Sequence, residues 1–168
     1  MTHQIAAVSA QEILDSRSRP TLSVAVDLVG GAAGTAGVPS GASTGSREAV
    51  ELRDGDPGRF GGEGVLGAVA NVNGEIATAL DGRSFECLAD LDRALCDLDG
   101  TDTKGRLGAN AIVGVSMAAA RAMATAGQVP LVVNFNSSAS TDDGTIVSRL
   151  WDFGGGITST ATNPQFTF

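Results

Sequence analysis

Two glycine-rich segments of this chain have the composition of loops that bind phosphate groups. Residues 62–67 match the pattern G-x-G-x-x-G and precede a predicted helix, as in dinucleotide-binding folds. The residues before them, 53–60, read as a polar turn instead of the buried parallel strand that such a fold requires. Residues 41–46 have one residue too few between their glycines for a P-loop and lack its lysine. The sequence therefore argues against a nucleotide site at either segment.

Two groups of closely spaced aspartates could be drawn as metal sites. Asp54 and Asp56 form the first group, and Asp97, Asp99 and Asp102 form the second. Carboxylate oxygens suit hard cations such as Mg²⁺. Both groups lie in glycine-flanked turns, however, where Asp commonly accepts hydrogen bonds from its own backbone. We therefore expect these aspartates to form turns.

The cysteines and the single histidine offer little further chemistry. Cys87 and Cys96 lie on opposite faces of a predicted helix, so a disulfide between them has poor geometry. We expect free structural thiols. His3 stands alone near the N-terminus, and one imidazole makes neither a metal site nor a catalytic triad.

The N-terminal third of the chain has the hydrophobic period of β-strands. Residues 22–29 alternate between apolar and small or polar side chains, which predicts a half-buried strand that ends at Gly30 and Gly31. Strands at about 4–14 and 33–38 would flank it through short, turn-rich connections. We expect a three-stranded antiparallel meander.

Beyond Gly45 the apolar residues recur at every third or fourth position, which is the period of amphipathic helices. Residues 64–126 are predicted to contain at least three helices packed on the meander. The segment 109–126 is built largely from Ala, Gly and Ser, so neighbouring backbones can approach it closely. Strands followed by helices indicate an α+β fold. The apolar positions of the first two helices are Val65, Val69, Val72, Ile76 and Leu80, then Leu88, Leu91, Leu95 and Leu98.

The composition of the 168 residues bounds the classes of function. Eleven basic and nineteen acidic residues give a net charge of −8, which disfavours nucleic acid and anionic membrane as partners. The first residues lack the basic and apolar regions of a signal peptide, and no uncharged apolar run approaches membrane-spanning length. We expect a cytoplasmic protein.

Several ungapped sequence blocks, in one order over about residues 4–132, resemble the N-terminal domain of enolase. The blocks are Glu12-Ile13-Leu14-Asp15-Ser16-Arg17, Val38-Pro39-Ser40-Gly41-Ala42-Ser43-Thr44-Gly45, Glu48-Ala49-Val50-Glu51-Leu52-Arg53-Asp54-Gly55-Asp56, Gly64-Val65-Leu66-Gly67-Ala68-Val69-Ala70-Asn71-Val72-Asn73, Asp99-Gly100-Thr101, and Leu107-Gly108-Ala109-Asn110-Ala111-Ile112-Val113-Gly114-Val115-Ser116. The resemblance implies the same α+β fold, a three-stranded meander followed by a helical subdomain.

The resemblance also assigns a role to the second glycine-rich segment. In enolases the corresponding loop closes over the substrate, and its serine, Ser43 here, completes the coordination of a second Mg²⁺ through its oxygens. Small residues between two glycines can change backbone angles at little steric cost, as a lid must. The implied substrate lid consists of Gly41, Ala42, Ser43, Thr44 and Gly45.

The reaction that the resemblance implies is that of phosphopyruvate hydratase, a magnesium-dependent lyase of glycolysis that converts 2-phosphoglycerate to phosphoenolpyruvate and water. In the family the catalytic base, the catalytic acid and the carboxylates of the first Mg²⁺ belong to a β/α barrel. A barrel of about 250 residues does not fit within this chain. We therefore assign no catalytic residue, expect weak or absent Mg²⁺ binding, and expect no activity from these residues alone. Glu48 and Glu51, the acids nearest the lid, are predicted to lie on a short helix.

Two kinds of partner follow from this reading, a separate enolase barrel chain or a second copy of the chain. Gln11 and Ser23 stand where enolases commonly place an Arg and a Glu that pair across the dimer. Ser18 also replaces the glycine of a family turn. The alternative functions are a non-catalytic binding or scaffold module, and a truncated or chimeric product without a selected function.

The composition changes at about residue 133, where helical periodicity stops. Residues 134–168 resemble a fragment of a PKD domain, a β-sandwich, through Trp151-Asp152-Phe153-Gly154 and the closing Asn163-Pro164. A sandwich needs about seven strands, and only two or three fit here. We expect two domains, an enolase N-terminal-like domain at 1–133 and an incomplete PKD-like sandwich at 134–168.

Overall fold

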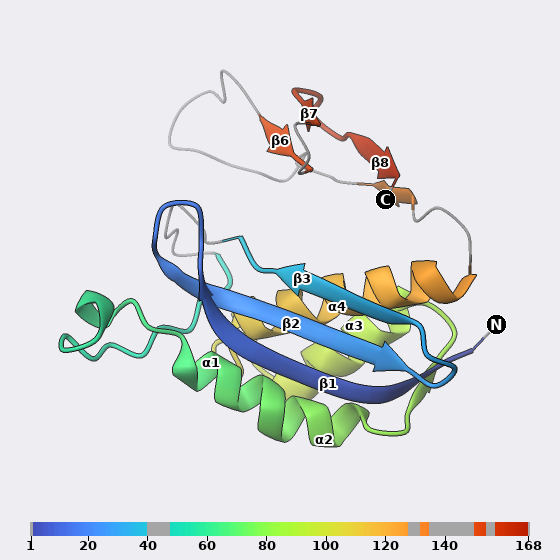
Figure 1. The fold of residues 1–168 in the computed structure, drawn as a ribbon, viewed down its shortest axis with the longest axis horizontal. Helices are drawn as coiled ribbons and strands as arrows, with labels where there is room; N and C mark the ends of the chain where they lie inside the picture. Colours follow the sequence, from blue (N-terminus) through green and yellow to red (C-terminus); the bar gives the residue numbers. More distant parts are fainter. Residues whose placement is uncertain (1, 40–47, 128–131, 135–149, 154–156, 168) are drawn as a thin grey trace. The chain divides into compact units, whose positions relative to one another are not determined.

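The computed structural model describes residues 2–39, 48–127, 132–134, 150–153 and 157–167. Contacts divide the chain into two compact units, Met1–Gln128 and Val129–Phe168, called here the head unit and the tail unit. The head unit has the predicted α+β fold, with strands first and helices afterwards (Figure 1).

The sheet of the head unit is the predicted antiparallel meander with one short addition. Its strands are β1 (His3–Leu14), β2 (Pro20–Leu28), β3 (Ala33–Gly37) and β4 (Ser84–Phe85), in the order β3-β2-β1-β4. The alternation along β2 is confirmed, because Leu22, Val24 and Val26 are fully buried. The two-residue strand β4 pairs with His3 and Gln4 and was not predicted. It is too short to carry a periodic signal.

The turn between β1 and β2 contains Ser18, at the position where the resemblance implies a glycine. The Asp15 carboxylate accepts hydrogen bonds from the amides of Arg17 and Arg19, at 2.8 and 2.9 Å. These bonds and the Arg17 side chain hold the pKa of Asp15 below its usual value. Ser18 adopts a φ of 60°, a left-handed conformation that glycine occupies without a Cβ penalty. The turn is therefore kept by side-chain hydrogen bonds where a glycine is absent.

The first predicted helix is continuous but contains a wide turn. It consists of α1 (Leu66–Asn71), the π-helical η2 (Val72–Ile76) and α2 (Ala77–Leu80), and a separate short 3-10 turn, η1 (Phe60–Gly62), precedes it. From η2, Asn73 Nδ2 donates to the Ala10 carbonyl at 2.9 Å, and Asn73 Oδ1 accepts from the Ala10 amide at 2.7 Å. The Asn73 side chain thus satisfies the backbone groups of Ala10, at a part of β1 that has no pairing with β4.

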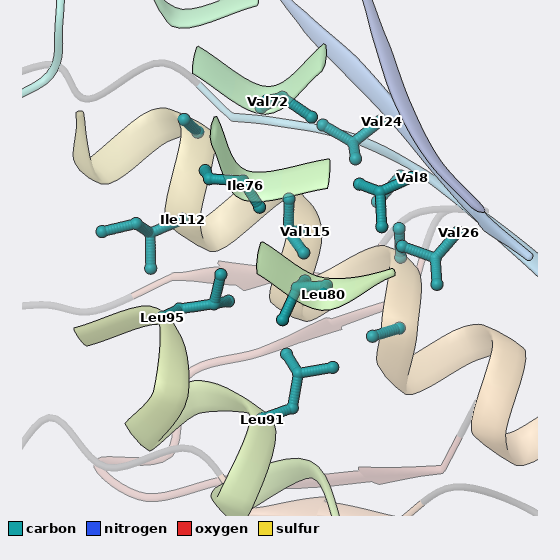
Figure 2. Close-up of a cluster of buried hydrophobic side chains, with 14 of the residues drawn as sticks. Val8, Val24, Val26, Val72, Ile76, Leu80, Leu91, Leu95, Ile112 and Val115 are labelled. Atoms are coloured by element: carbon teal, nitrogen blue, oxygen red, sulfur yellow. The ribbon is translucent and has the colours of Figure 1, made fainter. Parts of the chain in front are cut away.

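Two further helices complete the head unit, α3 (Leu88–Asp99) and α4 (Ala109–Gly127). Helix α4 packs on β2 and β3, α3 packs on α4, and the helix from α1 to α2 packs on β1. The close approach predicted for the small-residue helix occurs at Gly34, where an added Cβ would lie 2.2 Å from the Ala118 carbonyl oxygen. Figure 2 shows side chains from both layers in the core, among them Val8, Val24, Val26, Val72, Ile76, Leu80, Leu91, Leu95, Ile112 and Val115.

The tail unit contains two small antiparallel ladders. Strand β5 (Val132–Asn134) pairs with β8 (Gln165–Thr167), and β6 (Trp151–Asp152) pairs with β7 (Thr158–Ser159). The Phe153 and Phe166 rings stack with centroids 4.5 Å apart. The PKD-like sandwich and the domain ranges 1–133 and 134–168 remain sequence-based predictions.

Candidate functional site

The predicted lid residues, Gly41, Ala42, Ser43, Thr44 and Gly45, lie outside the described residues. The described chain reaches Pro39 and resumes at Glu48. We call residues 38–39 the incoming stem and residues 50–54 the outgoing stem. These two stems are the described residues on either side of the predicted lid segment.

The incoming stem is fixed to the start of β2. The Val38 amide donates to the Leu22 carbonyl at 2.8 Å, and the Thr21 hydroxyl donates to the Val38 carbonyl at 2.7 Å. The Val38 side chain is buried, and a Cβ added at Gly114 of α4 would lie 2.8 Å from its Cγ2 atom. Both polar groups of the Val38 backbone therefore have a partner, and its side chain is held by α4.

The outgoing stem is fixed to the beginning of α4 and to the turn before it. The Val50 amide donates to the Thr103 carbonyl at 2.7 Å, and the Ala109 amide donates to the Val50 carbonyl at 2.8 Å. Asn110 Nδ2 donates to the Leu52 carbonyl, and Asn110 Oδ1 accepts from the Leu52 amide, both at 3.1 Å. The side chain of Asn110 therefore pairs with Leu52 as a neighbouring strand would.

The short helix predicted around Glu48 and Glu51 is wrong, because residues 49–56 have no helical structure. The side chain of Arg53 connects these residues to other parts of the head unit. Its guanidinium donates to the carbonyls of Pro20 and Glu63 at 2.7 and 2.6 Å and to the Glu51 carboxylate at 2.6 Å. The outgoing stem is thereby connected to Pro20 at the start of β2, beside the residue that holds the incoming stem.

A buried carboxylate organises the turn that receives the outgoing stem. Asp99 is 2% exposed. It accepts hydrogen bonds from the hydroxyl and the amide of Thr101 and from the Leu107 amide, the last at 2.8 Å. Burial acts to raise the pKa of Asp99, but these hydrogen bonds and the nearby Arg106 hold it below the usual value. The carboxylate therefore stays ionised and closes the loop from residue 99 to 107.

Asp54 serves the beginning of helix α1. Its two oxygens accept hydrogen bonds from the Leu66 and Gly67 amides at 2.9 and 2.8 Å. A Cβ at Gly64 would lie 2.4 Å from Asp54 Oδ2, so this glycine is needed for the approach. Two amides that a phosphate could use at a helix N-terminus are thus occupied by the chain's own carboxylate. The glycines at 64 and 67 in the G-x-G-x-x-G match therefore lie against the Asp54 carboxylate at the start of α1.

A second carboxylate, on β1, joins the same region. Arg59 donates hydrogen bonds to both oxygens of Glu12, one of them at 2.9 Å, and the Val65 amide donates to Glu12 at 2.8 Å. The Arg59 hydrogen bond is the main cause that holds the pKa of Glu12 below its usual value, against the opposing effect of burial. Neither this ion pair nor its partners were predicted, because the residues lie far apart in the sequence.

The other residues considered in the sequence are an aspartate in a turn and two cysteines. The Asp56 carboxylate accepts from the Gly58 amide at 2.9 Å, as a turn residue does. Cys87 and Cys96 are both free, and Cys87 is exposed rather than buried. Within the part of the chain that is described, no group of three or more His, Cys, Asp or Glu side chains could hold a metal ion. No helix among the same residues is long and apolar enough to cross a membrane.

Comparison with known proteins agrees with the fold. Residues 5–134 match the family described as "Enolase, N-terminal domain". Over 128 residues the chain is 59% identical to the enolase of Rubrobacter xylanophilus. This chain belongs to the enolase family. The alignment covers 76% of the chain and 30% of that enolase, so the chain spans about a third of the relative's length.

The enolase match, residues 5–134, contains the predicted lid segment, both stems and every residue named above that holds the stems. Sequence reasoning placed Asn110 in a family block but gave it no role, and it gave none to Thr21. A signal was available at Asn110, because Asn is a poor helix former and here opens an alanine-rich apolar helix. Thr21 gave no comparable signal, since Thr is common in strands.

Proposed function

We propose that this chain provides the N-terminal, lid-bearing domain of an enolase, which converts 2-phosphoglycerate to phosphoenolpyruvate and water. The observation that carries the proposal is the 59% identity to an enolase across a head unit that fixes both ends of the lid segment. The family places the reaction in glycolysis and in the cytoplasm. In the complete reaction, the contribution of this chain is to position the lid over substrate bound elsewhere.

The oxygens of Ser43 are of the kind that Mg²⁺ accepts, but they are not enough to hold it. Mg²⁺ is usually bound through carboxylates and substrate phosphate and keeps several of its waters. Both carboxylates of the outgoing stem are already engaged: Glu51 with Arg53, and Asp54 with the first amides of α1. When bound, the ion would stabilise the negative charge that develops on the substrate carboxylate. Its other ligands must come from outside the described residues.

We also propose that the 168-residue polypeptide has no activity by itself. Removing the weakly acidic proton beside a carboxylate requires a placed base and electrostatic stabilisation of the resulting charge. The family draws the base, the acid and the carboxylate ligands from the barrel. Among the described residues, Glu51, Arg53, Asp54 and Arg59 are paired with each other or with backbone groups, so they do not replace the barrel's groups.

The experiment is a continuous assay of phosphoenolpyruvate formation by ultraviolet absorbance, at several Mg²⁺ concentrations. The chain is tested alone and together with a separately expressed barrel of the Rubrobacter xylanophilus enolase. We expect no turnover by the chain alone and partial rescue by the mixture. Ser43→Ala should reduce the rescued rate by roughly 10- to 100-fold, whereas Ser84→Ala, at an exposed position on β4, should leave it unchanged. Turnover by the chain alone, or no rescue, would contradict the proposal.

A further inference from the structure

One feature of η2 has no part in the proposed function, the single Asn-Gly pair of the sequence, Asn73-Gly74. An asparagine before glycine is prone to lose its side-chain amide, because glycine has no Cβ to hinder its backbone nitrogen from reaching the asparagine side chain. Asn71 is followed by the β-branched Val72, which hinders the same approach. The helix therefore carries a reactive asparagine and a hindered one two positions apart.

Neither packing nor backbone geometry explains the glycine at position 74. A Cβ added there would meet nothing within 4 Å, and Gly74 does not have a positive φ. Alanine is the better helix former, so Gly74→Ala should fit and favour η2. Gly64, by contrast, is required for packing, because a Cβ there would lie 2.4 Å from Asp54 Oδ2. What Gly74 does change is access to the side chain of Asn73.

The pairing of Asn73 with β1 opposes this reaction in the folded chain. Asn73 Nδ2 donates to the Ala10 carbonyl at 2.9 Å, and Asn73 Oδ1 accepts from the Ala10 amide at 2.7 Å. These two bonds hold the side-chain amide toward β1, and the helical backbone of η2 restricts the rotation that would turn it toward the Gly74 nitrogen. Asn73 is exposed at the edge of the sheet, however, so a local opening is sufficient to release it.

The reaction needs only the chain and water. The Gly74 nitrogen gives up its proton and bonds to Asn73 Cγ, while the Cγ–Nδ2 bond breaks and Nδ2 leaves as ammonia. The product is a cyclic imide, a succinimide, between the two residues. Water then adds to one of the two ring carbonyl carbons, and the bond from that carbon to nitrogen breaks. The chain is left with an aspartate or with an isoaspartate, in which the backbone runs through Cγ.

We propose that Asn73 is a site of spontaneous deamidation, which the pairing with Ala10 holds back and which releases η2 from β1 once it has occurred. This site would operate whether or not the chain acts in the enolase reaction. An aspartate side chain has no N–H for the Ala10 carbonyl. An isoaspartate adds a backbone atom within η2, so neither product reproduces the paired geometry. Hydrolysis of the imide does not restore the amide, and the change is therefore one-way.

The test follows deamidation of the 168-residue chain at mildly alkaline pH, both folded and in guanidinium chloride. Trypsin releases residues 60–83 as one peptide that contains both Asn71 and Asn73, so mass spectrometry with fragmentation gives the two rates from the same sample. In denaturant, Asn73 should react faster than Asn71. In the folded chain, the rate at Asn73 should be at least about tenfold lower than in denaturant. Gly74→Ala should slow the reaction at Asn73 in both samples.

Two proline variants, checked for folding by circular dichroism, test the role of the pairing. Ala10→Pro removes the amide that Asn73 binds and leaves the ladder with β2, because both backbone groups of Ala10 face Asn73. Ala33→Pro makes the same change on β3, at a residue that also faces away from β2, since the neighbouring Ala32 accepts the ladder bond from Leu28. Folded Ala10→Pro should deamidate at Asn73 about fivefold faster than the parent, and folded Ala33→Pro at the parent rate.

A rate at Asn73 that does not exceed the rate at Asn71 in denaturant would overturn the site. Equal rates in the folded and the unfolded parent would overturn the protection by Ala10, and this comparison requires no variant to fold. A parent rate in folded Ala10→Pro, or equal acceleration by both proline variants, would do the same. The deamidated chain carries an added negative charge, is separable by anion exchange, and should unfold at a lower denaturant concentration than the unreacted chain. Equal concentrations would show that η2 is not released.

Discussion

The head unit and the tail unit are stabilised in different ways. In the head unit, long elements bury one face each, and apolar side chains from strands and helices form one continuous core. In the tail unit the described ladders are two or three residues long. Among the tail residues whose burial is described, only Pro164 is buried. Side-chain contacts in the tail unit include the Phe153–Phe166 stack, the bond from the Trp151 indole to the Ala161 carbonyl and the bond from the Ala161 amide to the Ser159 hydroxyl.

The difference shows that hydrophobic periodicity predicts the packing of long elements but not of short ones. A 9-residue strand and a 19-residue helix repeat their buried positions often enough to specify a face and a packing partner. Isolated short hairpins are marginal in water because they bury too little apolar surface. We therefore expect substitutions in the head unit to change stability more than substitutions in the tail unit.

The largest effect is expected where two backbones approach each other in the head unit. In Gly34→Ala the new Cβ would lie 2.2 Å from the Ala118 carbonyl oxygen and 2.4 Å from the Ala122 nitrogen. Since these are backbone atoms, α4 must move away from β3, and we expect a loss of about 3 kcal/mol or more. Denaturant unfolding followed by far-ultraviolet circular dichroism measures this.

Gly74 is the matched control, because it lies in η2 with open space around an added Cβ. Gly74→Ala should be neutral or stabilise the head unit by up to about 1 kcal/mol. Equal losses in Gly34→Ala and Gly74→Ala would show that the contact between α4 and β3 is not the cause.

The next largest effect concerns Asp99 and depends on pH. Asp99→Asn replaces an acceptor with a donor beside the amides that it binds, and we expect a loss of about 2–3 kcal/mol at pH 7. Because the pKa of Asp99 is lower in the folded chain than in the unfolded chain, its stabilisation is present above about pH 4 and is lost as the pH falls through the folded pKa. The difference between parent and variant should therefore narrow as the pH falls below about 4.

The control for Asp99 is Asp90, whose exposed ion pair with Arg93 is 3.1 Å long. Asp90→Asn should change stability by less than about 1 kcal/mol across the same pH range. A pH-independent difference between Asp99→Asn and the parent would contradict the account of the buried carboxylate.

The smallest expected effect on the head unit comes from the tail unit. Phe153→Ala removes the ring stack with Phe166. We expect Trp151 fluorescence to change, since this is the single tryptophan of the chain. The unfolding transition of the head unit, followed by circular dichroism, should shift by less than about 0.5 kcal/mol. A large shift would show that the two units unfold together.

The sequence predicted the elements whose period is long, and it missed the features that depend on distant residues. The alternation along β2 and the apolar repeat of α3 were sufficient to place both elements. The wide turn η2 was not predicted, and the pairing of Asn73 in that turn with Ala10 joins residues 63 positions apart, beyond the reach of a hydrophobic period. The stem contacts of Thr21 and Asn110 are of the same kind, and the lid assignment of Ser43 came from the family resemblance.

The most direct test of the central claim compares a polypeptide of residues 1–134 with the full 168 residues in the rescue of a separately expressed enolase barrel. If the head unit is the functional enolase domain, both should restore phosphoenolpyruvate formation at rates within about twofold of each other at saturation. Rescue that disappears without residues 135–168, or that fails with both polypeptides, would contradict the assignment of enolase function to the head unit.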